Sequence, residues 1–325
     1  MPREEKAATV VRSGFDEDNW DITTPEKNEL CPNNQPLIKW ATKNWWVNYQ
    51  CNWSEEWKKW WTYVWGGGDE PQYNCNFDPK RFFLWTSDPK DQVPLLELKA
   101  FKPPGDEAWI ASEIVLEDLL GYGHYLVTAK TAGDFGNLDP WVVFGIFTYQ
   151  WGDANVAQEG GDNRKREIDL LETIAGERQT YDNNNAQFAL QLATANRENG
   201  LIGGQRFTIP ANTQYITVYM QRVRPTKDSP RGEVIYKCFA GDYILADVRG
   251  NKVTPLLGGT WEVKRNSPYY DKVPLHTQVS RERLHINLYV PGGGYDKDTK
   301  SYNPDKAPKS PQSVYLKRFQ YEASV

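Results

Sequence analysis

The chain has 325 residues, 14 of them Trp, and a formal net charge of -5. An acidic chain of this kind is a poor partner for nucleic acid, and no apolar run approaches the roughly 20 residues that cross a bilayer. Gly, Pro and aromatic residues are abundant while long helical periodicity is rare, so we expect short strands and loops rather than helix bundles.

Residues 1–30 are polar and carry few strand signals, so we expect a lead-in segment there. No apolar segment follows the charged first residues, so no secretory signal is visible. The cysteines are even in number and allow two disulfides in three connectivities, while free buried thiols are an equally weighted alternative. They are Cys31, Cys51, Cys75 and Cys238.

Tryptophan is concentrated between residues 40 and 65. The spacing of Trp53, Trp57, Trp60 and Trp61 would place these rings on one side of a helix. We interpret the segment as an insertion that packs against a β-sandwich. The alternative is a platform of rings that extends a ligand-binding cleft.

From residue 81 onward, short strand-like runs bounded by turn residues follow one another, and no Pro/Ser-rich linker divides them. We therefore expect one domain over residues 1–325. The predicted strands are 81–87, 108–115, 123–131, 141–150, 167–172, 187–192, 215–221, 284–290 and 313–322.

Several of these strands have one apolar face and one face of rings, amides or acids. Val142, Phe144 and Ile146 suit a core, for example, and Gly145 leaves room between the rings on the opposite face. If the strands are neighbours, they form a concave sheet whose lining suits an extended sugar chain. The lining residues that we expect are Trp141, Phe147, Tyr149, Trp151, Gln187, Tyr219, His285, Asn287 and Tyr289.

One short stretch carries three carboxylates at positions i, i+2 and i+5: Glu167, Asp169 and Glu172. In a regular strand Glu167 and Asp169 share one face, while Glu172 points to the other. One extra residue in a β-bulge would bring Glu172 back to the face of Glu167. Like charges so arranged repel one another, so a functional reason is needed. The alternative is a solvated strand edge with scattered acids.

Glycoside hydrolysis supplies such a reason. A retaining glycosidase uses two carboxyl groups about 5–5.5 Å apart, one as nucleophile and one as proton donor. A third carboxylate between them would hold the nucleophile and keep the pKa of the donor high.

The run from Phe147 to Tyr149, followed by the acidic motif 166–172, resembles glycoside hydrolase family 16. That family includes laminarinases, lichenases, agarases, carrageenases and xyloglucan-active enzymes. The segments 123–127, 284–289 and 314–319 are similar to further strands of the family, with Leu126 in place of its Glu. The resemblance covers about residues 105–322. It implies an all-β fold, a concanavalin A-like β-jelly-roll sandwich of two antiparallel sheets, here with a Trp-rich N-terminal insertion.

The resemblance also implies an activity, that of a retaining endo-glycosidase. It would hydrolyse or transglycosylate a β-linked polysaccharide, for which we expect a β-1,3- or mixed-linkage glucan. Glu167 would be the nucleophile, Glu172 the general acid/base, and Asp169 the carboxylate that supports Glu167. The i, i+5 spacing resembles the laminarinase and agarase branches more than the lichenases, whose acids lie at i, i+2 and i+4.

Some positions depart from the family pattern. If Tyr219 matches the Tyr of a later family strand, Thr217 stands in place of its His and Val223 in place of its Trp. These departures leave open a second function, that of a non-catalytic carbohydrate-binding or structural β-sandwich protein.

No His, Cys and Asp cluster has the spacing of a transition-metal site, so we expect no catalytic metal and no cofactor. A structural calcium ion is common in the family's fold, but no residues are assigned to it. The expected partner is a polysaccharide, without nucleic acid or membrane, and the expected form is a monomer outside the cell or in the cell wall. A strongly sulfated substrate is not expected, because the lining contains few cations. The basic run 164–166 is the exception and would lie at a rim.

Overall fold

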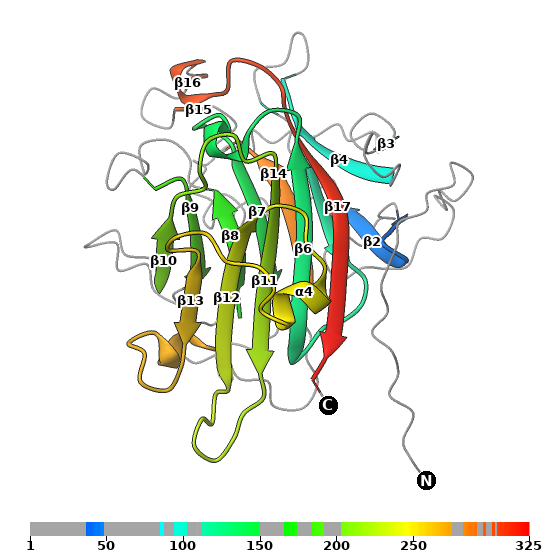
Figure 1. Ribbon diagram of the computed structural model, residues 1–325. Helices are drawn as coiled ribbons and strands as arrows, with labels where there is room; N and C mark the ends of the chain where they lie inside the picture. The colour runs from blue at the N-terminus through cyan, green and yellow to red at the C-terminus, as the bar shows by residue number, and fades with distance from the viewer. Residues whose placement is uncertain are drawn as a thin grey trace, which may run out of the picture.

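The computed structural model describes residues 37–48, 85–87, 94–102, 109, 112–149, 166–173, 184–191, 203–274, 282–290, 295–296, 301–302 and 304–324. Within these ranges the chain is built almost entirely of strands, and two large antiparallel sheets lie face to face (Figure 1). No helix in the described part of the chain has the length and apolar character needed to cross a membrane.

The larger sheet contains eight strands among the described residues. Its strand at position six, β8, carries the acidic motif and lies between β7 and β9. In spatial order, the strands are β1 (Leu37–Trp40), β2 (Lys43–Asn48), β5 (Ser112–Leu116), β14 (Arg283–Tyr289), β7 (Val143–Tyr149), β8 (Ile168–Thr173), β9 (Ala186–Leu190) and β10 (Gly203–Phe207).

The second sheet contains seven strands within the same ranges. In spatial order, they are β13 (Thr260–Val263), β12 (Glu233–Ala240), β11 (Tyr215–Val223), β6 (Gly123–Thr131), β17 (Gln312–Ala323), β4 (Pro94–Ala100) and β3 (Trp85–Ser87). The remaining elements are short: η2 (Phe135–Asn137), α4 (Leu245–Arg249), η5 (Tyr270–Lys272), η7 (Pro304–Lys306) and the pair β15 (Tyr295–Asp296) and β16 (Ser301–Tyr302).

The chain repeatedly crosses from one sheet to the other, so strands that are neighbours in space are often far apart in sequence. For example, β14 pairs with β5 and β7, and β17 pairs with β4 and β6. The prediction of an all-β jelly-roll sandwich of two antiparallel sheets is confirmed.

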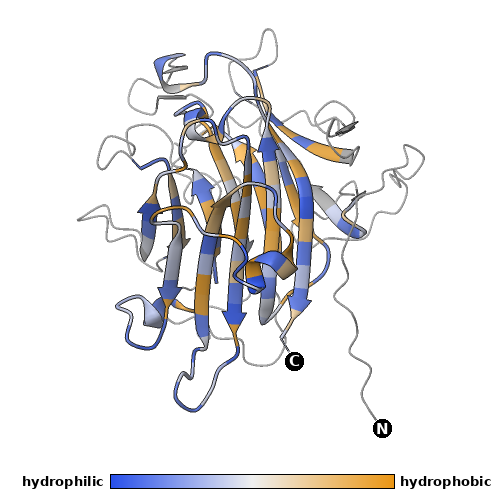
Figure 2. Ribbon diagram, viewed as in Figure 1, coloured by the Kyte–Doolittle hydropathy of each residue, from blue (hydrophilic) through white to orange (hydrophobic). Residues whose placement is uncertain are grey.

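The core lies between the two sheets, because alternate side chains along each strand point inward. Hydrophobic and hydrophilic residues accordingly alternate along many of the strands (Figure 2). A column of rings illustrates how the sheets contact one another. Phe188 of β9 stacks on Tyr236 of β12 with ring centroids 5.2 Å apart, and Tyr236 stacks on Trp261 of β13 at 5.1 Å. Burial of such rings contributes much of the stability of a sandwich and holds the eight-stranded sheet firmly from behind.

The start of the Trp-rich segment differs from the expected insertion. Its described part forms β1 and β2, a hairpin that belongs to the eight-stranded sheet. Trp40 and Trp45 are buried, and Trp45 packs edge-on against Phe319 of β17 with centroids 5.4 Å apart. These two rings are therefore core residues. The predicted helical side of Trp53, Trp57, Trp60 and Trp61 lies outside the described residues.

Cys238 lies on β12 with its thiol in the core, and it is a free cysteine. A pairing of all four cysteines in two disulfides is therefore wrong. The other three cysteines lie outside the described residues. Burial raises the pKa of the Cys238 thiol to about 12, so this residue is an apolar packing element and not a reactive thiolate.

Asp134 fastens the turn after β6 to the loop before β11. Its Oδ1 accepts hydrogen bonds from the backbone N–H groups of Gly136 at 2.8 Å and Thr213 at 3.0 Å, and its Oδ2 accepts one from Asn212 at 2.5 Å. Burial alone would raise the pKa of Asp134, but these three backbone donors outweigh burial and lower it. The ionised carboxylate therefore stabilises the folded chain.

We expect Asp134→Ala to lower the free energy of unfolding at pH 7 by about 0.5–2 kcal/mol, the usual cost of losing a capping side chain. Because the folded-state pKa is lowered, this contribution is present above the ordinary Asp pKa and is lost as the pH falls through the folded pKa. Urea unfolding of both proteins at pH 7 and pH 3 should show a difference that shrinks in acid. An equal difference at both pH values would contradict this account.

Candidate active site

The register of β8 with its two neighbours contains an irregularity between the second and third acids. On β7, Phe147 faces Asp169 and Gly145 faces Glu172; on β9, the partner of Asp169 is Ala189. The two-residue step from Phe147 to Gly145 on β7 thus spans three residues of β8, and the register with β9 shifts between the same two acids. This is a β-bulge with one extra residue, and it places Asp169 and Glu172 on the same face.

The bulge coincides with two consecutive leucines. Leu170 and Leu171 are both fully buried, as is Ile168 just before them. A regular strand would turn one of the two leucines toward the solvent-facing side of the sheet. The bulge instead lets both leucines contribute to the core cluster, and it also turns Glu172 outward. The sequence-based prediction of a bulged strand is confirmed.

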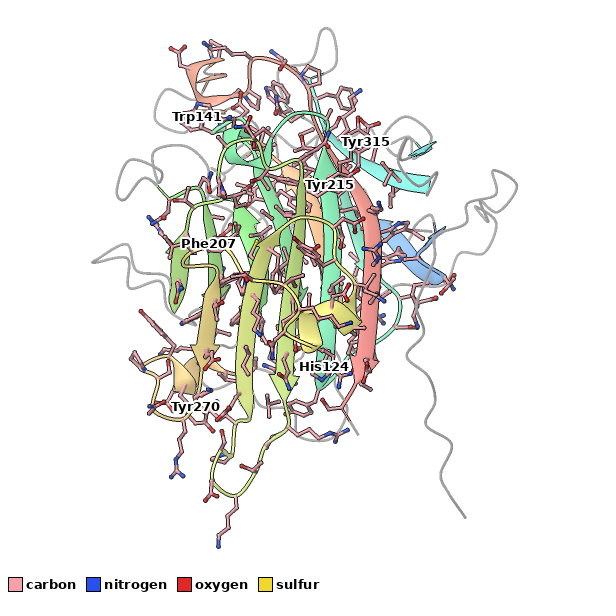
Figure 3. The ribbon with its side chains drawn as sticks, in the orientation of Figure 1. His124, Trp141, Phe207, Tyr215, Tyr270 and Tyr315 are labelled. Atoms are coloured by element: carbon pink, nitrogen blue, oxygen red, sulfur yellow. The ribbon has the colours of Figure 1, made fainter. Side chains whose placement is uncertain are left out.

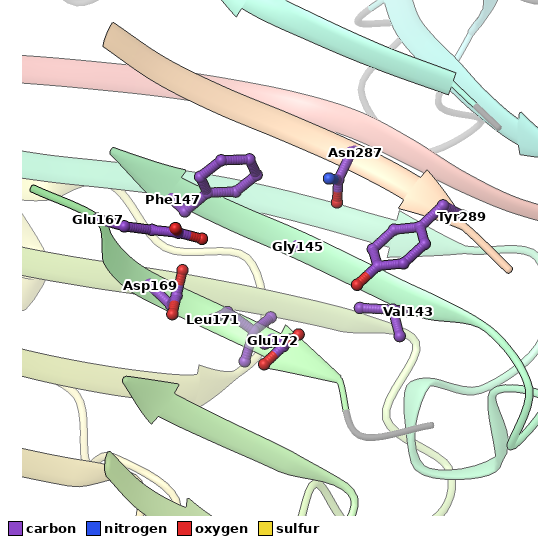
Figure 4. A pocket seen from close by; sticks show the side chains of 9 residues that line it. All are labelled: Val143, Gly145, Phe147, Glu167, Asp169, Leu171, Glu172, Asn287 and Tyr289. Atoms are coloured by element: carbon purple, nitrogen blue, oxygen red, sulfur yellow. The ribbon is translucent and has the colours of Figure 1, made fainter. Parts of the chain in front are cut away.

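A pocket lies over this part of the sheet (Figure 4). The side chains of the three acids point into it, Glu167 from just before β8 and the other two from β8, with Asp169 in the middle (Figure 4). Three neighbouring strands supply the lining: Val143, Gly145 and Phe147 of β7, Glu167 immediately before β8, Asp169, Leu171 and Glu172 of β8, and Asn287 and Tyr289 of β14.

Two glutamine amides, one on β9 and one on the residue that follows it, donate hydrogen bonds to the acids. Gln187 Nε2 donates to Glu172 Oε2 at 2.5 Å, and Gln191 Nε2 donates to Asp169 Oδ2 at 2.9 Å. The sequence predicted Gln187 as a lining residue but not Gln191 as a site residue. Its signal was the alternation of the strand, since Gln191 shares a face with Gln187 and Ala189.

Asp169 is buried, with 4% of its surface exposed, between two other carboxylates. Burial raises its pKa well above the ordinary value, and repulsion from Glu167 and Glu172 raises it further. The hydrogen bond from Gln191 opposes this shift but does not cancel it. Asp169 therefore keeps its proton at pH values where an ordinary aspartate is ionised, and in that form it can donate a hydrogen bond to a neighbouring carboxylate.

Aromatic rings form a wall beside Glu167. The Phe147 ring stacks on the His285 ring with centroids 4.9 Å apart, and Tyr149 meets His285 edge-on at 5.9 Å. Burial raises the pKa of the Tyr149 hydroxyl, and the carboxylates of Glu167 and Glu113 raise it further. Tyr149 therefore stays a neutral phenol close to Glu167 and Glu113.

Gly145 leaves room for a side chain of β14 that reaches across β7. A Cβ at this position would lie 2.5 Å from Asn287 Oδ1. The Asn287 side chain thus occupies the space above Gly145. Gly145 is also the residue of β7 that pairs with Glu172. The Oδ1 of Asn287 is buried and accepts no hydrogen bond from the described residues, so an acceptor lines the pocket close to the acids.

Tyr219 was predicted to line the cleft, and this prediction is wrong. Tyr219 lies on β11 in the other sheet, on the face turned away from the sandwich core. It packs with Leu126 and with Leu245 and Val248 of α4, and its hydroxyl lies 2.8 Å from Nδ1 of His124 (Figure 3 labels His124 beneath α4). Because α4 covers this face, the residues that point outward from it are similar in type to those of a cleft lining, although Tyr219 does not belong to the pocket.

Other expected residues lie in different places. Trp141 is half-buried in the turn before β7 and is not part of the pocket lining (Figure 3), and Trp151 lies outside the described residues. Arg166 is buried and has a φ of 51°, so it does not lie at a rim as predicted for the basic run 164–166. In the described part of the chain, no group of three or more His, Cys, Asp or Glu residues is placed to hold a metal ion.

The chain is similar to several solved structures whose names include β-glucanases and a pseudo β-glucanase. One is a glycoside hydrolase family 16 protein of Bacteroides ovatus, named for mixed-linkage glucan and solved in complex with a product. It is 11% identical, with 86% of this chain and 94% of that chain covered and a TM-score of 0.49. A pseudo β-1,3-glucanase of Mycobacterium tuberculosis is 14% identical, with coverages of 86% and 91% and a TM-score of 0.48. For a β-glucanase of Bacillus licheniformis, the identity is 16%, the coverages are 77% and 88%, and the TM-score is 0.41.

No protein-family model matches the sequence, and a search of curated proteins found no match.

We expect Asp169→Asn to raise the free energy of unfolding at pH 7 by about 0.5–2 kcal/mol, at the expense of any activity. The folded-state pKa of Asp169 is raised, so its burial is tolerated at low pH and becomes increasingly destabilising as the pH rises above the unfolded pKa. The amide removes that penalty. Urea unfolding at pH 7 and pH 4 should show a gain in stability that is larger at pH 7. A variant less stable than the parent at pH 7 would show that the carboxyl group contributes more than its repulsion costs.

Proposed function

We propose that this protein is a retaining glycoside hydrolase that cleaves a β-linked glucan, with Glu167, Asp169 and Glu172 as its catalytic acids. The observation that carries the proposal is the bulge at Leu170 and Leu171, which places these acids side by side over a pocket. Three carboxyl groups on one partly buried face repel one another when ionised and add nothing to folding stability, so their convergence is expected where they do chemistry.

Each acid has a distinct role in this mechanism. The Glu167 carboxylate attacks the anomeric carbon while Glu172 gives its proton to the leaving oxygen, so that a glycosyl ester forms on Glu167 and the first sugar product departs. Glu172, now ionised, takes a proton from water or from a sugar hydroxyl, whose oxygen attacks the anomeric carbon and releases Glu167. The two attacks leave the configuration unchanged.

The surroundings of the acids support this division of roles. Asp169 is held protonated by its burial and by its two neighbours, so it can donate a hydrogen bond to Glu167 and share its negative charge. Gln187 holds the Glu172 carboxylate at 2.5 Å on the other side of the acid row. Rings and amides along β7 and β14 supply the stacking and hydrogen-bonding surface that a sugar needs.

A neutral β-1,3- or mixed-linkage glucan fits the lining better than a strongly anionic chain. Four acidic side chains, those of the acid row and of Glu113, lie on or beside this face, and no Lys or Arg is among the residues that line the pocket in the described part of the chain. Sulfate groups would be repelled by such a surface.

Glu167→Gln should lower the hydrolysis of laminarin or lichenan on the order of 10⁴-fold or more, because the amide cannot form the glycosyl ester. Glu172→Gln should lower it by about 10²–10⁴-fold, and much less for an aryl glycoside whose leaving group needs no proton. Added azide should restore turnover in Glu172→Gln and give a β-glycosyl azide.

Glu262→Gln is a matched control for these variants. Glu262 lies on β13 and pairs with Lys264 at 2.5 Å, away from the acid row, so its loss should leave turnover unchanged. Reducing-end release that persists in Glu167→Gln would reject the assignment. Oligosaccharide binding without product formation in the unaltered protein would favour the carbohydrate-binding alternative.

The bulge itself can be tested by changing its length. Deleting Leu170 leaves the acids at i, i+2 and i+4, which a regular strand carries on one face, so we expect some hydrolysis to persist. Inserting a second Leu after Leu171 should abolish hydrolysis, because the third acid turns toward the core if the bulge persists and lies about 7 Å further from Glu167 than in the deletion variant if the strand becomes regular. Initial rates on lichenan, with circular dichroism to verify folding, measure both effects. Complete loss of activity in a folded deletion variant would contradict the geometry.

A further inference from the structure

Glu113 and His285 form a buried pair that the mechanism above does not use. His285 of β14 and Glu113 of β5 lie on the pocket face of the sheet, and His285 Nδ1 lies 2.9 Å from Glu113 Oε1. Their side chains are 8% and 16% exposed. A carboxylate accepts hydrogen bonds and cannot donate them when ionised, so the nitrogen that faces Glu113 must carry a proton.

That contact determines which nitrogen of His285 is free to bind a ligand. With the proton on Nδ1, the neutral ring has an unprotonated Nε2, which is a hydrogen-bond acceptor. Nε2 has no hydrogen-bond partner in the described part of the chain, since the contacts of His285 are the Glu113 pair and the rings of Phe147 and Tyr149. The stack on Phe147, itself part of the pocket lining, fixes the ring plane.

A second acceptor lies two residues further along the same strand. Asn287 Oδ1 lines the pocket, is buried, and accepts no hydrogen bond from the described residues. His285 and Asn287 alternate with core residues of β14 and so lie on one face. Two acceptors in a row fit a ligand that presents donors, and a sugar with free hydroxyl groups is such a ligand.

We infer that Glu113 is a positioning residue that fixes the Nδ1–H tautomer of His285, so that His285 Nε2 accepts a hydrogen bond from a free hydroxyl of the glucan. The inference rests on the proposed function for the identity of the ligand. It adds a requirement to that function, because a sugar whose hydroxyl is methylated or absent at this subsite loses the interaction. The tautomer itself can be measured without any substrate.

The first test is nitrogen NMR of the whole chain labelled with ¹⁵N-histidine. The chain has three histidines, so the spectrum is simple, and the variant His285→Gln identifies the signals of His285. At pH 8 we expect His285 to carry its proton on Nδ1, whereas exposed histidines prefer the Nε2–H form. Glu113→Leu should shift His285 toward that form, and Glu117→Leu, a nearby acid that accepts from Asn44 instead, should not. A wild-type His285 protonated on Nε2, or on both nitrogens, would overturn the inference.

The second test is kinetic. Loss of one neutral hydrogen bond to substrate should raise KM on laminari-oligosaccharides about 3- to 10-fold in Glu113→Leu, with kcat nearly unchanged. Glu113→Gln keeps an acceptor for Nδ1–H and should restore much of the affinity. An unchanged KM in a folded Glu113→Leu protein with an altered tautomer would overturn the inference. If the unaltered protein shows no turnover, calorimetric binding of the same oligosaccharides replaces KM, so failure of the proposed hydrolysis is distinguished from failure of this pair.

Discussion

The bulge at Leu170 and Leu171 is the constraint on which the site depends. A strand alternates strictly, so three acids at i, i+2 and i+5 cannot share a face without one extra residue. The backbone irregularity is held in place because both leucines are fully buried in the core, together with Ile168. Apolar burial on one side of β8 thus fixes the positions of the carboxylates on the other, although those carboxylates repel one another.

The rest of the sandwich makes this arrangement tolerable. Stacked rings from β9, β12 and β13 support the sheet from behind, and Gln187 and Gln191 donate to two of the three acids. Immediately before the acid row, Arg166 adopts a left-handed backbone conformation with φ of 51°, which is costly for a residue other than glycine. Backbone strain and carboxylate repulsion therefore occur together at β8 and the residues just before it, where the packing of the surrounding sheets holds the backbone in this conformation.

Much of this could be predicted from the sequence, because alternation along single strands identifies faces. The strand over 123–131 and the bulge near Leu170 follow from local patterns. Which sheet a strand joins depends on long-range pairing, which alternation does not encode. Tyr219 was wrongly predicted to line the cleft for this reason. Its face of β11 is covered by α4, so the residues on that face are similar in type to a cleft lining. The pairing of His285 with Glu113, 172 positions apart, was hidden in the same way.

The polar side chains on the two sides of the acid row differ in whether they already have hydrogen-bond partners within the described part of the chain. On the β9 side, the amides of Gln187 and Gln191 are committed to Glu172 and Asp169. On the β14 side, Asn287 Oδ1 accepts no hydrogen bond from the described residues, and Gly145 leaves room for this side chain over β7. Donors thus stabilise the charged row, while acceptors remain on the side where a hydroxyl-rich chain would lie. Leaving a buried amide oxygen without a partner costs about 1–3 kcal/mol, and a hydroxyl group in the pocket, from water or from a sugar, would supply the missing donor.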